Sequence, residues 1–71
     1  MAREKVLRKT VVETEYSIFV LEKVYYTDFQ ETAYLVMDLL GDFCEDYTTE
    51  KEAAAAFEEA VKAALNEESN N

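Results

Sequence analysis

Residues 28–47 read DFQETAYLVMDLLGDFCEDY, and apolar side chains recur through this stretch at steps of 4, 3, 4, 3 and 4. Wound as a helix, the stretch gathers these side chains into one apolar stripe and turns its polar side chains to the opposite side. Such a stripe must be covered by other segments, because apolar surface is unfavourable in water. The sequence therefore predicts a central helix over residues 28–47. The stripe consists of Phe29, Ala33, Val36, Leu40, Phe43 and Tyr47.

The predicted central helix has a capping signal at its start and a glycine near its end. Asp28 can cap the first turn, and Glu31 follows where a capping box places an acidic residue. Gly41 would cost about 1 kcal/mol relative to alanine inside the helix. Alternatively, this glycine ends the helix at Leu40.

A competing interpretation makes residues 32–40 a strand that pairs back on residues 16–26 through the polar residues 27–31. The helical spacing continues beyond Gly41, however, through Phe43 and Tyr47. A strand ending at residue 40 leaves this continuation without a role, so the pattern favours the helix.

Residues 10–26 are rich in β-branched and aromatic side chains and alternate as a strand does. From Ile18 to Leu21 both faces are apolar, which is typical of a strand covered on both sides. Whether Val6 to Val12 forms a separate first strand stays open, because the turn candidate at residues 13–15 has no Gly, Asn or Pro. One long bent strand that pairs with a second subunit is the alternative.

Residues 49–52 read TEKE, a capping box, and strong helix formers follow from Ala53 to Leu65. Only Thr48 separates this helix from the predicted central one, so the two should pack as an antiparallel hairpin. The predicted fold is a small α+β domain, in which an N-terminal β segment, a hairpin, packs on two antiparallel helices. The chain forms one domain over residues 1–71, with frayed ends at 1–5 and 67–71.

The charge is strongly negative and unevenly distributed. Sixteen acidic and seven basic residues give a net charge of −9. Residues 1–27 hold five basic and four acidic residues, whereas residues 28–71 hold two basic and twelve acidic ones. This balance argues against direct binding to nucleic acid or to anionic lipid, because phosphate contacts require Lys and Arg. It suits a partner with a basic surface.

The residue types that carry most catalysis are scarce. The chain has no histidine, which removes the commonest general base and metal ligand. A single cysteine, Cys44, excludes an internal disulfide and is expected to be a small buried hydrophobic residue. The lone Gly41 excludes a glycine-rich phosphate loop. We therefore expect no enzyme, no cofactor and no metal site, and, without a signal peptide or membrane span, a cytoplasmic protein.

The outer face of the predicted central helix would carry an acidic band, with Tyr34 beside it as an aromatic anchor of the kind that interfaces favour. This band predicts a non-enzymatic module that binds a basic protein surface. Its sharpest form is a nucleic-acid mimic of a phage or mobile element, an inhibitor in the nucleic-acid-binding site of its partner. The band could instead serve solubility alone; a cation is disfavoured, because carboxylates on one helix face do not enclose it. Its members are Glu31, Asp38, Asp42, Glu45 and Asp46.

Apolar residues on both faces of the predicted strand indicate uncovered surface in a monomer, which a homodimer would bury. The residues expected at this interface are Phe19, Leu21 and Tyr25. The alternative function is accordingly a structural or assembly subunit, in which the apolar strand drives oligomerisation and the acidity serves only solubility.

Overall fold

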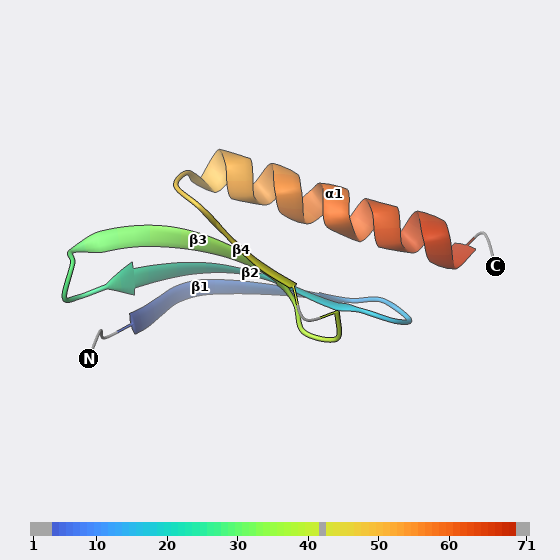
Figure 1. Ribbon diagram of the computed structural model, residues 1–71, viewed down its shortest axis with the longest axis horizontal. Coiled ribbons are helices and arrows are strands. Elements are labelled where there is room, and N and C mark those ends of the chain that lie inside the picture. Colours follow the sequence, from blue (N-terminus) through green and yellow to red (C-terminus); the bar gives the residue numbers. More distant parts are fainter. Residues whose placement is uncertain (1–3, 42, 70–71) are drawn as a thin grey trace.

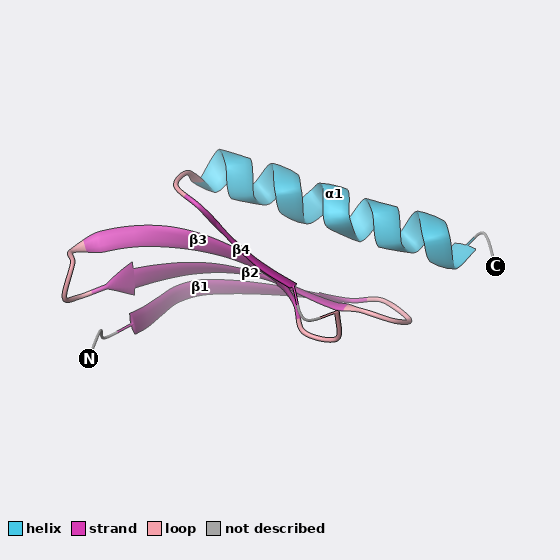
Figure 2. Cartoon of the chain, viewed as in Figure 1, coloured by secondary structure: helices cyan, strands magenta, loops and turns pink. Residues whose placement is uncertain are grey.

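The computed structural model describes residues 4–41 and 43–69, which form one antiparallel sheet and one helix (Figure 1). The strands follow one another across the sheet in the order β1-β2-β3-β4. The helix α1 lies along one face of this sheet (Figure 2). The elements are β1 (Glu4–Glu13), β2 (Ile18–Tyr26), β3 (Glu31–Asp38), β4 (Phe43–Tyr47) and α1 (Glu50–Ser69).

The predicted fold of a hairpin on two helices is wrong, because residues 31–38 and 43–47 form the strands β3 and β4. The competing strand interpretation is the correct one: β3 pairs with β2 from Tyr26↔Glu31 to Phe19↔Asp38. Residues 33–37 are apolar at every position, so their spacing fits a helix and a strand equally well. Pairing with β2 supplies backbone hydrogen bonds that the local spacing does not reveal.

The predicted capping box at Asp28 is also wrong, since residues 27–30 form the turn of the β2–β3 hairpin. Gln30 closes this turn with a φ of 53°, in the left-handed region. That conformation costs a side-chain-bearing residue about 1–2 kcal/mol. The pairing of the two strands on either side offsets this cost.

The open question about the first strand is answered by a β1–β2 hairpin within the chain. Its turn uses a threonine hydroxyl group where glycine or asparagine is more usual: the Ser17 N–H donates to Thr14 Oγ1 at 3.1 Å. The Thr14 N–H donates to the Ser17 carbonyl oxygen at 2.9 Å. The pairing register shifts between Val6 and Arg8, which marks a β-bulge in β1.

The C-terminal helix confirms the prediction made from its capping box. The Thr49 hydroxyl group accepts a hydrogen bond from the Glu52 N–H at 3.3 Å and donates to Glu52 Oε1 at 2.9 Å. Residues 67–69, predicted as part of a frayed end, belong to α1, and residues 4 and 5 belong to β1; the other predicted end residues lie outside the described residues. No helix in the described chain is both long and apolar enough to cross a lipid bilayer.

Two polar contacts tie the ends of α1 to the sheet. At its start, Glu50 forms an ion pair with Arg8 of β1. Near its end, the Glu68 carboxylate accepts hydrogen bonds from the Thr14 hydroxyl group and the Glu15 N–H, both at 2.8 Å. These contacts fix β1 and the β1–β2 turn relative to α1.

Between α1 and the sheet lies a small core, and we call the face that contributes to it the covered face. Its buried residues are Phe19, Val36, Ala53 and Phe57. Partly buried residues pack around them: Val12, Leu21, Tyr34, Tyr47, Ala56, Ala60, Val61 and Ala64.

Side chains alternate along each strand, so the intervening residues form the opposite face, which we call the open face. Its central residues, Val20 and Val24, are 1% and 0% exposed. They lie outside the cluster beneath α1, and no helix covers this face in the part of the chain that the structure describes. Residues that pair on neighbouring strands form rows across this face, from β1 towards β4. These rows are Val11–Val20–Met37–Cys44, Lys9–Glu22–Leu35–Asp46 and Val6–Val24–Ala33.

Candidate functional site

The fourth strand forms one edge of the sheet in the described chain, where it pairs with β3 alone. Glu45 and Asp46 point to opposite faces, because neighbouring residues alternate along a strand. Glu45 stands opposite Val36 and lies on the covered face, whereas Asp46 stands opposite Leu35 on the open face. The exposed residues of this strand are Phe43, Cys44, Glu45 and Asp46.

Carboxylates of β4 and α1 come together where the helix passes this edge. The pKa of Tyr47 is raised, first because its hydroxyl group donates a 2.7 Å hydrogen bond to Glu45, then by desolvation, and also by the charges of Glu45 and Glu52. Glu45 therefore contacts the Tyr47 hydroxyl group, and the charge of Glu52 also acts on it. Glu59 follows Glu52 by seven residues, which places it on the same side of the helix. We call Glu45, Glu52 and Glu59 the acidic side.

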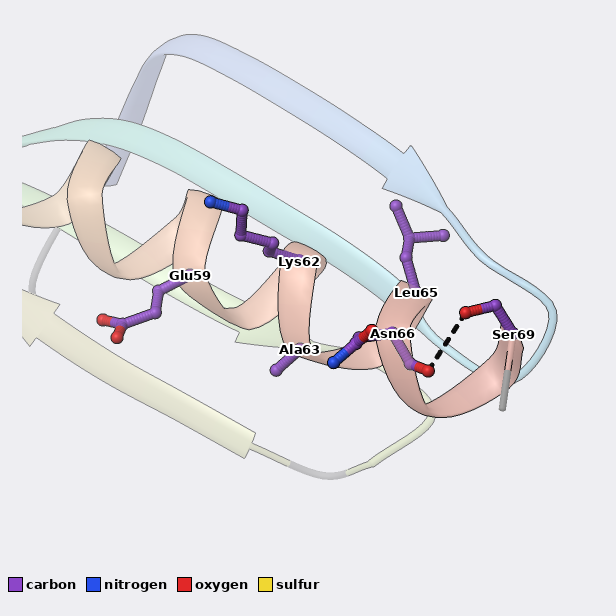
Figure 3. A pocket seen from close by; sticks show the side chains of 6 residues that line it. All are labelled: Glu59, Lys62, Ala63, Leu65, Asn66 and Ser69. Carbon is purple, nitrogen blue, oxygen red and sulfur yellow. Dashed lines mark hydrogen bonds between the residues drawn. The ribbon is translucent and has the colours of Figure 1, made fainter. Parts of the chain in front are cut away.

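In Figure 3, Glu59 and Lys62 lie one turn apart on α1, and their side chains point away from each other. All three residues of the acidic side are exposed. Sequence reasoning identified Glu45 but missed Glu52 and Glu59, because it placed Glu45 on a helix and not on a strand that α1 passes. The seven-residue spacing of the two helical glutamates was the available signal.

The acidic band predicted for residues 28–47 is divided, because its helix does not exist. Glu31 is exposed at the start of β3 and stands opposite Tyr26 on the open face. Asp46 shares that face, whereas Glu45 belongs to the acidic side. Asp42 lies outside the described residues.

Asp38 anchors the turn from β3 to β4. Its Oδ1 accepts hydrogen bonds from the N–H groups of Ile18 at 3.3 Å and Leu40 at 3.1 Å. Desolvation acts to raise the pKa of this carboxyl group, but the backbone N–H groups of Gly41, Ile18 and Leu40 lower it overall. A Cβ atom on Gly41 would lie 2.6 Å from Asp38 Oδ2, so a larger residue here would displace the Asp38 carboxylate. The charge of Asp38 is thus already engaged within the chain.

The predicted anchor Tyr34 is half-buried on the covered face, where it packs against the core. Lys23 Nζ lies 5.9 Å from the centroid of its ring, a cation–π contact. Exposed apolar side chains lie instead at and beside the β3–β4 turn, and we call them the apolar tip. They are Leu39, 58% exposed, Leu40, 62% exposed, and Phe43, 41% exposed.

The residues predicted for an oligomer interface lie in or near the interior of the chain. Phe19 is 6% exposed in the core, and Leu21 packs against the same cluster. Tyr25 is half-buried near the end of β2. An interface through Phe19 would therefore require α1 to leave the sheet. The prediction that Cys44 is buried is wrong, since this residue is exposed on β4.

The hollow drawn in Figure 3 is formed by α1 alone. Its walls include no second element that could enclose a ligand. The lining residues are Glu59, Lys62, Ala63, Leu65, Asn66 and Ser69. Across residues 4–41 and 43–69, no group of three or more His, Cys, Asp or Glu residues is placed to hold a metal ion.

The sequence and structure of this chain were also compared with those of known proteins. Comparison with models of protein families, with curated proteins and with solved structures found no significant match.

Proposed function

We propose that this protein is a non-enzymatic binding module whose acidic side docks on the basic surface of another protein. The observation that carries the proposal is the separation of charge by the fold. The described elements β3, β4 and α1 together hold ten acidic and two basic residues, whereas β1 and β2 hold three acidic and four basic ones. Such a field accelerates encounter with a positively charged surface and disfavours an acidic one.

The apolar tip supports the same proposal from a second direction. Charged rims steer association, while desolvated apolar anchors supply much of the binding energy. Phe43 is 41% exposed and begins the edge strand that carries Glu45. Phe43 and Glu45 lie on the same face of β4, so an apolar anchor and a charged residue adjoin there.

In its sharpest form, the module is an inhibitor that occupies the nucleic-acid-binding site of its partner. Exposed carboxylates present the charge that such a site recognises in phosphate groups. The net charge of −9 keeps the protein itself away from nucleic acid. Its binding should then be salt-dependent and mutually exclusive with nucleic acid.

Two charge-reversal variants with equal net charge test the proposal. Glu45→Lys with Glu59→Lys changes the acidic side, and Glu15→Lys with Asp28→Lys changes exposed residues of the β1–β2 and β2–β3 turns. Glu52 stays unchanged, because it takes part in the helix cap. Circular dichroism and urea unfolding should show that both variants fold.

Each protein is immobilised and exposed to nuclease-treated lysate of its native host, washed at low and at high salt. We expect a nucleic-acid-binding protein to be retained at low salt by the wild type and by the turn variant, but not by the acidic-side variant. Added DNA or RNA should displace it. Equal retention by both variants, or retention that nucleic acid does not affect, would contradict the proposal.

A further inference from the structure

The two outer strands of the sheet differ in how well their free edges are protected. Among the described residues, β1 pairs only with β2 and β4 only with β3, so each has one edge without a partner. A β-bulge interrupts β1 between Val6 and Arg8. This strand also holds three basic residues, of which Arg8 is tied to α1 through its ion pair with Glu50. Bulges and basic side chains are the usual protection of an edge strand against further pairing.

The fourth strand has neither protection. From Phe43 to Tyr47 it pairs with β3 without a shift in register. It holds no lysine, arginine or proline, and its first four residues are exposed. Within the described chain, the edge of β4 is therefore regular and accessible, which are the properties that allow another strand to pair with it.

The hydrogen bonds of the sheet show which backbone groups of β4 face this edge. The Leu39 N–H donates to the Ile18 carbonyl oxygen at 2.9 Å, and this pair continues the β2–β3 register by one step. Backbone N–H and C=O groups alternate in direction along a strand, so the alternate residues of β3 bond to β4. The N–H and C=O groups of Cys44 and Asp46 therefore point to the free edge. The residues of β4 that bond to β3 in the observed register are Phe43, Glu45 and Tyr47.

Carboxylates flank this edge on both faces of the sheet. Glu45 points to the covered face and Asp46 to the open face. The Tyr47 hydroxyl group holds the Glu45 carboxylate through its 2.7 Å hydrogen bond. A strand added at this edge would place one residue beside Glu45 and the next beside Asp46, where opposite charges are favourable. The edge therefore fits a strand with two adjacent basic residues.

A second copy of this chain fits the edge less well. Because β4 holds two acidic residues and no basic one, pairing of β4 with β4 would bring like charges together. The first strand has basic residues, but its bulge interrupts pairing and Glu50 engages its Arg8. Pairing of β1 with β4 would also continue from copy to copy without closing. Charge and strand geometry together favour a strand of another, basic protein.

We infer that β4 binds an extended basic segment of its partner by strand addition, with the segment lying antiparallel beside β4. The backbone groups of Cys44 and Asp46 supply the hydrogen bonds, and the carboxylates of Glu45 and Asp46 select the two adjacent basic residues. This inference rests on the proposed function, because it specifies how the basic partner is bound. It adds a requirement that charge alone does not make, namely free backbone N–H groups on both strands.

Synthetic peptides test strand addition to the purified protein. The probe has the sequence Thr-Thr-Arg-Lys-Val-Ile-Thr, in which arginine would lie opposite Asp46, lysine opposite Glu45 and valine opposite Cys44. One version carries N-methyl groups on the arginine and valine amides, which would face β4. The matched control carries them on the lysine and isoleucine amides, which would point away from β4. Both versions have the same charge and composition.

Binding is followed by NMR titration at low salt. We expect the first methylated peptide to bind at least about tenfold more weakly than the unmethylated one, because it cannot donate to the edge. The control peptide should bind as well as the unmethylated one. Amide exchange at Cys44 and Asp46 should slow when the unmethylated peptide binds, because their N–H groups become paired.

Two variants of one residue test the same contact from the side of the protein. Cys44→Pro removes an N–H group that faces the free edge, whereas Cys44→Val keeps it, and neither changes the charge. Proline is tolerated at an edge position whose N–H group points outward. Cys44→Pro should weaken binding of the unmethylated peptide at least about tenfold, and Cys44→Val should not. Circular dichroism shows whether both fold; should the proline variant unfold, the methylated peptides decide.

Equal binding of the two methylated peptides would overturn the inference, and so would absence of binding up to about 1 mM peptide. If binding is equal but is lost in Glu45→Lys with Glu59→Lys, the proposed function stands and docking uses side chains alone. Open-ended growth of the protein by itself in sedimentation equilibrium would also overturn the inference, because β1 of a second copy would then occupy the edge. Retention from lysate tests the proposed function separately.

Discussion

The covered face and the open face are built from alternate residues of the same strands, yet within residues 4–41 and 43–69 a helix covers only the first of them. Neighbours on β2 show the contrast, since Phe19 is 6% exposed and Val20 is 1% exposed. Phe19 is buried in the cluster with α1, whereas Val20 lies outside that cluster. Burial at the centre of a sheet therefore does not reveal whether a second layer lies above it.

The rim of each face is more informative than its centre. On the covered face, Val12 at the edge strand is half-buried because it packs against the cluster that holds α1. On the open face, the adjacent Val11 is 48% exposed. One residue along the same strand thus separates the face that α1 covers from the face that no helix covers in the described chain.

The largest effect is expected where α1 meets the covered face. Phe57→Ala should lower the free energy of unfolding by about 3–5 kcal/mol, because it removes a buried ring and leaves a cavity. Leu65→Ala, on the exposed side of the same helix, should cost less than about 1 kcal/mol. Urea unfolding measures both. A small loss for Phe57→Ala would mean that α1 contributes little to the stability of the sheet.

A smaller effect is expected at the centre of the open face. Val24→Ala should lower the free energy of unfolding by about 1.5 kcal/mol, because Val24 is 0% exposed within the chain. Val11→Ala should cost less than about 0.5 kcal/mol, because Val11 is 48% exposed. Urea unfolding measures both. Equal losses for the two variants would remove the distinction between centre and rim.

The smallest effect on stability is expected at Asp38, which accepts backbone hydrogen bonds at the β3–β4 turn. Because its folded pKa lies below the unfolded value of about 3.9, its contribution is fully present above that value and is lost as pH falls through the folded pKa. Asp38→Asn should therefore cost about 1 kcal/mol at pH 7, and the difference from wild type should shrink below about pH 4. Urea unfolding of the wild type and of Asp38→Asn, measured from pH 7 to below about pH 4, tests this prediction. A constant difference at all pH values would contradict the role of the charge.

Local signals predicted the first and last parts of the fold well. The TEKE cap and the apolar spacing after it predicted α1, because helix caps and helical hydrogen bonds join residues close in sequence. The β-branched and aromatic residues of 10–26 predicted strand structure correctly, but their alternation continued through residues 14–17, where the structure has the turn between β1 and β2. The acidic side was only partly predictable: Glu45 stood out from its neighbours, but its proximity to Glu52 depends on how α1 crosses β4.

By itself, the sequence determined the negative charge of the C-terminal part, the strand alternation before residue 27 and the helix after residue 49. Only the tertiary structure decided that residues 31–47 are strands, since their hydrogen bonds go to residues distant in the sequence and their apolar side chains fit either state. Packing of one helix on one side of the sheet then decided which apolar face is covered, because both faces carry the apolar residues that a helix would bury.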